Sequence, residues 1–238
     1  LLALPTAAVA DEIPTEAPLA AASFPETVSA DALPTVQIDS GVVWTQAIAG
    51  NVVYVGGQFS NARPAGAAPG TNLVPRSNIL AYNLTTGELI NSFNPVVNNR
   101  VSDMAVSPDG TKLYAVGTFT QVNGETRNRI AVFDLPSGQL STTLIPNING
   151  VTQSVAATNS TVYVGGYFSA VNGTSRARIA AVNVANNRVL PFRPLVDNGQ
   201  VQSLTVNPEG TKLVLSGSFT SVGGVGDPGY GMAMVDAV

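Results

Sequence analysis

A segment of about fifty residues recurs along the chain and limits the folds that the chain can adopt. Its core, Gly-x-Phe-Ser/Thr, places equivalent aromatic residues at Phe59, Phe119, Phe168 and Phe219, which are 60, 49 and 51 residues apart. Repeats of this period are typical of arrays in which each repeat forms one supersecondary unit. We therefore interpret the 238 residues as containing one repetitive domain rather than two unrelated ones.

The second repeat predicts four short strands, at residues 101–106, 112–120, 128–134 and 139–144, separated by turns rich in Gly, Pro and Asn. Four strands in each repeat predict an all-β fold, a β-propeller of four-stranded blades. The remaining repeats align on the second, and the last of them has no fourth strand, which leaves about three and three-quarter blades. The predicted blades lie at about residues 43–93, 101–144, 151–192 and 201–236.

An incomplete last blade leaves two alternatives for how the apolar faces at the ends of the array are covered. In the first, the propeller closes with four blades, and residues 35–39 pair as the missing outer strand. In the second, the sequence is a fragment of a propeller of about six to eight blades, and the remaining blades of the full-length chain cover these faces. We expect the second alternative.

The composition excludes several kinds of site. The chain contains neither cysteine nor histidine, which excludes disulfides, thiolate nucleophiles, Cys/His zinc sites and a Ser-His-Asp triad. We expect no cofactor and no bound metal. Five of the 15 acidic residues lie within the first 34 residues, which contain no basic residue, so the rest of the chain has 11 basic and 10 acidic residues. This balance argues against a nucleic-acid or anionic-membrane surface.

The N-terminal segment differs in composition from the repeats. Residues 1–10 are apolar and end in Ala8-Val9-Ala10, a pattern typical of a signal-peptidase site, so we interpret them as the remnant of an export signal. Residues 11–34 are rich in Pro, Ala and acidic residues and predict a disordered linker before the propeller of residues 35–238. No apolar stretch is long enough to span a membrane. We expect a secreted or cell-surface protein.

The loop between the second and third strands carries a family resemblance. Residues 117–124 read GTFTQVNG, and residues 127–130 read RNRI. Together they resemble the delta-sixty repeats of bacterial secreted proteins. The third repeat is similar, the first is interrupted by an insertion at residues 62–75, and the last lacks the arginines. Residues 107–114 and 207–214 are also similar to surface-layer propellers. The resemblance implies an exported, cell-surface-associated repeat protein without assigned catalytic residues, and it names no ligand.

Arginines recur at the start of the predicted third strand and are the main binding candidates. Equivalent positions in successive blades converge on one face, where guanidinium groups suit carboxylates or acidic sugars. The alternative is scaffolding, in which each guanidinium binds loop carbonyls or an acid on the next blade; we assign Arg127 and Arg176 to it. We assign ligand binding to Arg129, Arg178 and Arg76, with Trp44 as a stacking platform or a space-filling residue. Structural roles are also expected for the repeat residues Gly57, Phe59, Gly117, Phe119, Gly166, Phe168, Gly217 and Phe219.

Acidic residues do not single out a catalytic pair, although Asp39, Asp103, Asp134, Asp197 and Asp236 lie at predicted strand ends. Asp109 and Gly110 are adjacent, as in a tight turn, whereas a sialidase Asp-box has a residue between its Asp and Gly. We therefore assign no catalytic residue and predict a non-enzymatic, exported module for surface binding or adhesion, with a glycan or protein ligand. The alternative is part of a secreted polysaccharide-active enzyme, a glycoside hydrolase or lyase, whose catalytic acids lie partly outside this segment.

Overall fold

The computed structural model describes residues 32–225 and 229–238. The predicted export-signal remnant and all but the last three residues of the predicted linker lie outside the described residues. In the part of the chain that is described, all regular elements are β-strands, as the sequence predicts. No helix in that part is long and apolar enough to cross a membrane.

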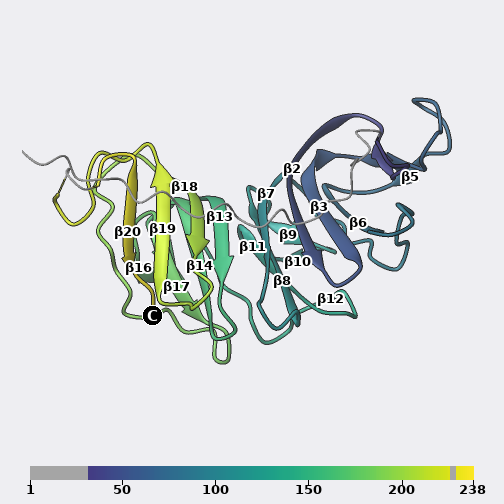
Figure 1. Cartoon of the computed structure of the whole chain (residues 1–238). Helices are drawn as coiled ribbons and strands as arrows, with labels where there is room; N and C mark the ends of the chain where they lie inside the picture. The colour runs from purple at the N-terminus through teal and green to yellow at the C-terminus, as the bar shows by residue number, and fades with distance from the viewer. Residues whose placement is uncertain (1–31, 226–228) are drawn as a thin grey trace, which may run out of the picture. The chain divides into compact units, whose positions relative to one another are not determined.

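Four antiparallel sheets follow one another along the chain, and we call them the first to fourth blades (Figure 1). Their strands are β2 (Gly41–Ala49), β3 (Val52–Phe59) and β6 (Ile79–Asn83) in the first blade; β7 (Val101–Val106), β8 (Lys112–Gly117), β11 (Ile130–Asp134) and β12 (Gln139–Leu140) in the second; β13 (Val151–Ala157), β14 (Thr161–Tyr167) and β17 (Ile179–Asn183) in the third; and β18 (Val201–Val206), β19 (Lys212–Gly217) and β20 (Met232–Asp236) in the fourth. The prediction of propeller blades is confirmed, but the outer strand is shorter than predicted. Single bridges, Tyr82 to Leu89 and Val182 to Val189, take its place in the first and third blades.

Short hairpins fill the connections between the second and third strands. They are β4 (Asn61–Arg63) with β5 (Val74–Pro75), β9 (Gln121–Val122) with β10 (Glu125–Thr126), and β15 (Ala170–Val171) with β16 (Thr174–Ser175). The Val-Asn-Gly motif forms the turn of the second and third hairpins, where Asn123 and Asn172 have φ values of 54° and 47°. Asparagine and glycine tolerate this left-handed conformation better than other residues, which explains the motif.

The segment before the first blade does not serve as the outer strand of the last one. β1 (Gln37–Ile38) pairs with β4 in the insertion of the first blade, with Gln37 opposite Arg63. The amide of Val36 also donates to the carbonyl of Gly87 in the same blade. Closure of four blades through residues 35–39 is therefore wrong, because the backbone groups of this segment are used by the first blade.

Every blade has the same β-bulge in its first strand. The pairing of the first and second strands shifts by one residue at Trp44, Ser102, Gln153 and Gln202. The repeat glycines Gly57, Gly117, Gly166 and Gly217 lie against these bulges, and a Cβ atom on each would overlap the backbone carbonyl oxygen two residues before the bulge residue. The sequence Gly-x-Phe is thus required because the bulged backbone crosses the second strand too closely for a side chain.

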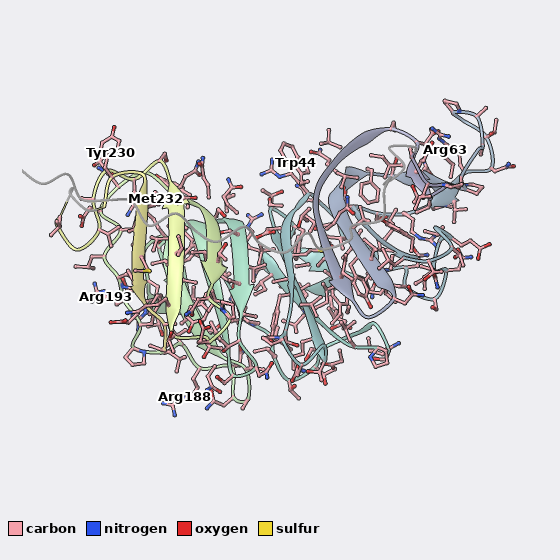
Figure 2. All side chains as sticks on the ribbon, in the orientation of Figure 1. Trp44, Arg63, Arg188, Arg193, Tyr230 and Met232 are labelled. Carbon is pink, nitrogen blue, oxygen red and sulfur yellow. The ribbon has the colours of Figure 1, made fainter. Side chains whose placement is uncertain are left out.

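The first and third strands of every blade start at the same end of the blade, where the connections between blades also lie. Figure 2 shows Trp44 and Tyr230 at this end of their blades, whereas Arg188 lies at the opposite end. We call the end at which Trp44 and Tyr230 lie the linker end, after the connections between blades that lie there. The third strands begin two residues later than predicted in the second blade, since Arg129 has a φ of 70° and lies just outside β11.

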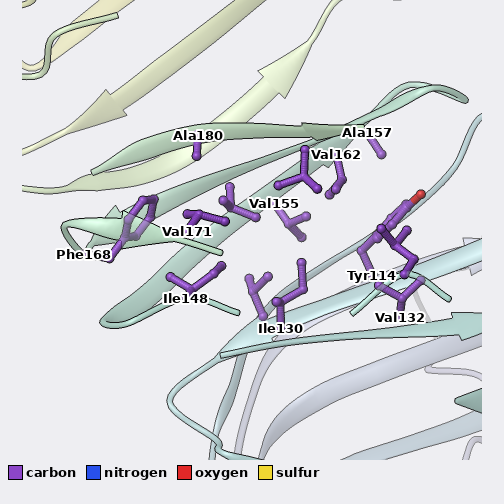
Figure 3. Packing of buried hydrophobic residues seen from close by; sticks show 14 residues of the cluster. Tyr114, Ile130, Val132, Ile148, Val155, Ala157, Val162, Phe168, Val171 and Ala180 are labelled. Carbon is purple, nitrogen blue, oxygen red and sulfur yellow. The ribbon is translucent and has the colours of Figure 1, made fainter. Parts of the chain in front are cut away.

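Most of the core lies in the spaces between blades, and one further cluster lies at the first blade. In β8, Tyr114 and Val116 pack toward the third blade, whereas Leu113 and Ala115 pack toward the first. Figure 3 shows the cluster between the second and third blades, which also contains Ile130 and residues of β13 and β14. Strands buried on both faces need apolar residues at consecutive positions, which explains why sequences such as RIAVF do not alternate.

Phenylalanines and tyrosines of the repeat pack in opposite directions. Phe119, Phe168 and Phe219 each pack in the cluster that their blade shares with the preceding one. Tyr114 and Tyr163 pack in the cluster shared with the following blade. Each interblade cluster therefore combines an aromatic residue from both of its blades.

Candidate functional site

Three arginines tie the connection before the third strand to the outer edge of their own blade. Arg127, which is 5% exposed, donates from Nη1 to the carbonyl of Thr126 (2.9 Å) and from Nη2 to the carbonyl of Ser141 (3.1 Å). Arg176 donates in the same way to the carbonyls of Ser175 (2.8 Å) and Leu190 (2.7 Å). We call this arrangement the arginine clamp. A rigid fork of donors is suited to holding two acceptors in fixed positions.

Arg76 makes the same clamp and was predicted to be available to a ligand. It is 3% exposed and donates to the carbonyl of Pro75 (2.7 Å) and to Oδ1 of Asn91 (2.8 Å). Its burial and bonding place it with Arg127 and Arg176, so its assignment to ligand binding is corrected. Of the two kinds of acceptor expected for scaffolding, Arg127 and Arg176 bind carbonyls and no acid on the next blade, and both acceptors belong to the blade of the arginine itself.

Arg129 and Arg178 occupy a different position, directly before the third strand. The position is left-handed in every blade, with φ values of 67° at Asn78, 70° at Arg129, 68° at Arg178 and 70° at Gly231. Asn78 donates to the carbonyl of Val97, and Arg178 donates to those of Val196 (3.1 Å) and Gly199 (2.8 Å). These acceptors lie in the connection to the next blade. Arg178 is therefore partly engaged in holding two blades, whereas Arg129 donates to the carbonyl of Thr118 in its own blade.

Asparagines in the connections between blades have a role that the sequence interpretation missed. Oδ1 of Asn98 accepts from the amides of Thr120 and Gln121, and Oδ1 of Asn149 accepts from those of Ser169 and Ala170. Each caps the turn that follows Gly-x-Phe. Their recurrence before the first strand was a signal, but it did not indicate which backbone groups they bind.

A groove at the linker end of the first blade lies beside Trp44. It has a volume of about 640 Å³ and is lined by Ser40, Gly41, Val42, Trp44, Gln58, Phe59, Ser60, Ser77, Asn78, Val96, Val97 and Asn98. The Trp44 side chain is 56% exposed, and the Cζ atom of Arg100 lies 5.5 Å from the centre of its ring. No hydrogen bond to another described residue uses the side chains of Gln58 or Ser77. We call this hollow the Trp44 groove.

Trp44 occupies the bulge position of the first strand. The register makes Ser102, Gln153 and Gln202 the equivalent residues in the other three blades. A bulge turns its extra residue away from the ladder, so the side chain is directed to solvent. The tryptophan therefore does not fill space in the core, and its exposure agrees with the stacking alternative.

The carboxylate of Asp103, in the second blade, accepts hydrogen bonds from the first and third blades as well as from its own. One oxygen of its carboxylate accepts from Thr45 Oγ1 in the first blade (3.1 Å) and from its neighbour Met104 N (2.8 Å). The other oxygen accepts from the Val155 amide in the third blade (2.9 Å). Burial raises the pKa of Asp103, and the three hydrogen bonds oppose that shift without cancelling it. These bonds occupy both oxygens and indicate a structural role.

The unfolding free energy should depend on pH with opposite signs at Asp103 and Asp109. The folded pKa of Asp103 is raised, so its contribution to stability is present below its unfolded pKa of about 3.9 and is lost as pH rises through the folded pKa. Hydrogen bonds from Ser107 and Thr111 lower the pKa of Asp109, so its contribution is present above about pH 4 and is lost as pH falls through the folded pKa.

We expect that wild type gains stability relative to Asp103→Asn, and loses it relative to Asp109→Asn, as pH falls from about 7 to about 3. Urea unfolding at several pH values measures both differences, and each variant serves as the control for the other. If the stability difference from wild type changed with pH in the same way for both variants, the opposite signs assigned to Asp103 and Asp109 would be wrong.

The other candidate carboxylates have partners of their own. Asp134 pairs with Lys112 (2.7 Å), Asp39 with Arg63 (3.5 Å), and Asp236 with Lys212. Asp197 accepts from the Ser221 hydroxyl and the Gly224 amide. Pairing within the blade suits structural roles at strand ends.

Comparisons with known proteins agree with this architecture. The sequence model of the Rax2 C-terminal beta propeller domain matches residues 79–218, and no curated protein sequence matches. The computationally designed Ika4 protein is similar in structure, with a TM-score of 0.50 and 11% identity over 85% of this chain and 96% of its own. A chain of the mitotic checkpoint complex has a TM-score of 0.50 and 15% identity over 81% of this chain, which spans 50% of that one. At such identities, the likeness concerns the fold alone.

Proposed function

Because the chain belongs to the Rax2 C-terminal beta propeller domain family and carries a groove beside an exposed tryptophan, we propose that it is a non-enzymatic module that binds a glycan at the cell surface. The observation that carries the proposal is the Trp44 groove. An exposed aromatic ring beside unused polar groups is the usual composition of a surface on which sugars stack.

The repeat supports a specific role for Trp44. The equivalent bulge positions hold Ser102, Gln153 and Gln202, so the fold does not need an aromatic residue there. A large apolar side chain that is 56% exposed contributes little to the core. The presence of tryptophan in one blade alone favours a ligand over scaffolding, since scaffolding recurs in every blade.

The non-enzymatic part of the proposal is supported by the bonding of the acidic residues. The oxygens of Asp103 are occupied by Thr45 and by two backbone amides. Glycoside hydrolysis needs two carboxyl groups facing one substrate, with one of them free to give up its proton. Export is proposed from the Ala8-Val9-Ala10 pattern.

Trp44→Ser, which installs the residue of the second blade, should weaken glycan binding by about tenfold or more without lowering the unfolding free energy. The measurement is a glycan array on the full chain, followed by calorimetric titration of the oligosaccharide that binds best. Trp44→Tyr should retain most of the affinity because it keeps a ring. Tyr230→Ala, at another exposed aromatic residue of the linker end, is the control.

Two results would contradict the proposal. One is an affinity that is unchanged in Trp44→Ser while that variant remains folded. The other is turnover of the bound glycan that a single Asp or Glu substitution abolishes, which would establish the enzyme alternative.

A further inference from the structure

The third blade has a second groove in the place that corresponds to the Trp44 groove. It has a volume of about 450 Å³ and is lined by Arg129, Asn149, Gly150, Val151, Tyr167, Phe168, Ser169, Ala177 and Arg178. Gly150 and Val151 correspond to Gly41 and Val42, and Tyr167 corresponds to Gln58. We call this hollow the Tyr167 groove. The two grooves share equivalent backbone positions at the start of the first strand and the end of the second, and they differ in their side chains.

The Tyr167 groove is positively charged. Arg129 uses one terminal nitrogen, Nη1, on the carbonyl of Thr118, and Arg178 uses Nε and Nη1 on the carbonyls of Gly199 and Val196. Donors therefore remain on both guanidinium groups, which are half-buried. Neither arginine forms an ion pair with a carboxylate of the described residues. Asp197 lines a neighbouring hollow with Arg178, but its carboxylate binds Ser221 and Gly224.

The backbone at Arg129 and Arg178 does not favour arginine. Both residues are left-handed, a conformation that costs a non-glycine residue about 1 kcal/mol or more. The same position holds Asn78 in the first blade and Gly231 in the fourth, and both residue types adopt it more easily. Arginine at two of the four positions therefore requires a gain other than local backbone stability.

Tyr167 is the second exception in the repeat. Its side chain is 63% exposed, and the equivalent residues are Gln58, Thr118 and Ser218. The other tyrosines of the second strands, such as Tyr114 and Tyr163, are buried. An exposed ring that only one blade carries, beside two guanidinium groups, adds a flat apolar surface to a cationic groove.

We infer that the Tyr167 groove binds a glycan that carries carboxylate groups, such as a chain of uronic acids. The guanidinium groups of Arg129 and Arg178 receive the carboxylate in charge-assisted hydrogen bonds, and the ring of Tyr167 stacks on the sugar. An acidic peptide would satisfy the arginines, but its flexible side chains have no flat face for the tyrosine. The inference deepens the proposed function, because it assigns a ligand class to a second site on the linker end.

The test is calorimetric titration of the full chain with an oligomer of galacturonic acid. Arg129→Asn and Tyr167→Thr install the residues of other blades, so the fold is kept, and each should weaken binding by about tenfold or more. Arg188→Ala, which removes an exposed arginine at the opposite end of the third blade, should leave the affinity unchanged. The methyl ester of the same oligomer, which lacks the charge, should bind at least about tenfold more weakly.

Several outcomes would overturn the inference. They are an absence of binding at millimolar oligomer, equal affinity for the methyl ester, unchanged affinity in both groove variants, or tighter binding of a glutamate-rich peptide. The proposed function has a separate measurement, the effect of Trp44→Ser on the array glycan. A negative result at the Tyr167 groove therefore leaves the proposed glycan site at the Trp44 groove untouched, and the reverse also holds.

Discussion

Gly117→Ala is expected to lower the unfolding free energy by about 3 kcal/mol or more. The added Cβ would overlap the carbonyl oxygen of Arg100 and would lie 3.0 Å from its carbonyl carbon and 3.1 Å from Ser102 N. All three atoms belong to the backbone at and just before the bulge, where the Thr118 amide binds the Arg100 carbonyl, and they cannot move away as a flexible side chain would. Urea unfolding followed by circular dichroism measures the loss.

Gly124→Ala is the matched control for this substitution. Gly124 lies in the β9–β10 turn with a φ of 80°, and a Cβ there would meet no atom within 4 Å. Only the strain of the left-handed conformation remains, about 1 kcal/mol. If Gly117→Ala does not fold, Gly166→Ala, in which the Cβ would overlap the carbonyl of Val151, should also fail while Gly124→Ala folds. Equal stability of the Gly117 and Gly124 variants would show that the close approach is unimportant.

Arg127→Ala is expected to lower the unfolding free energy by about 2 to 4 kcal/mol, because it removes both donors of a clamp and leaves a cavity where a long side chain was buried. The buried carbonyl of Ser141 loses its guanidinium partner. Arg127→Lys should recover only part of this loss, since an ammonium group cannot reach the carbonyls of Thr126 and Ser141 with two parallel donors.

The ion pair of Arg127 with Glu125 allows a control for charge. The pair is 2.9 Å long, but the Glu125 side chain is 60% exposed. Exposed pairs contribute less than about 1 kcal/mol, so Glu125→Ala should change stability little. A loss in Glu125→Ala as large as that in Arg127→Ala would assign the stabilisation to the ion pair and contradict the clamp.

The spacing of Gly-x-Phe was enough to predict the blades, because each repeat position has one backbone environment. Gly117 and Phe119 mark where the second strand meets the bulge and the preceding blade, and these constraints act within one period of the sequence. Strand ends were predicted less well. β8 ends at Gly117, where Asn98 caps the following turn, and β11 starts only after the left-handed residue Arg129.

The partners of the arginines could not be predicted from the sequence. Arg127 and Arg129 stand two residues apart at the start of one predicted strand, yet Arg127 is buried in a clamp and Arg129 lines a groove. The difference depends on whether the side chain points to the outer strand or to the next blade, which the periodicity does not specify. Tyr167 was missed for another reason. It stands at the variable position of Gly-x-Phe, and its difference from Gln58, Thr118 and Ser218 at that position is the informative signal.

The opposite packing of phenylalanine and tyrosine gives the series of blades a direction. At the first blade, Phe59 and its apolar neighbours are covered by Val36 and Ile38. At the fourth blade, Val214 stands where other blades place a buried tyrosine, and Met232 and Met234 are each 66% exposed. The two ends of the described array therefore differ: the surface of the first blade is covered, and the surface of the fourth blade is apolar and exposed. In every interblade cluster the phenylalanine of Gly-x-Phe comes from the later of the two blades. An additional sheet that packed on the fourth blade in the same way would therefore have to present the phenylalanine side of its own repeat.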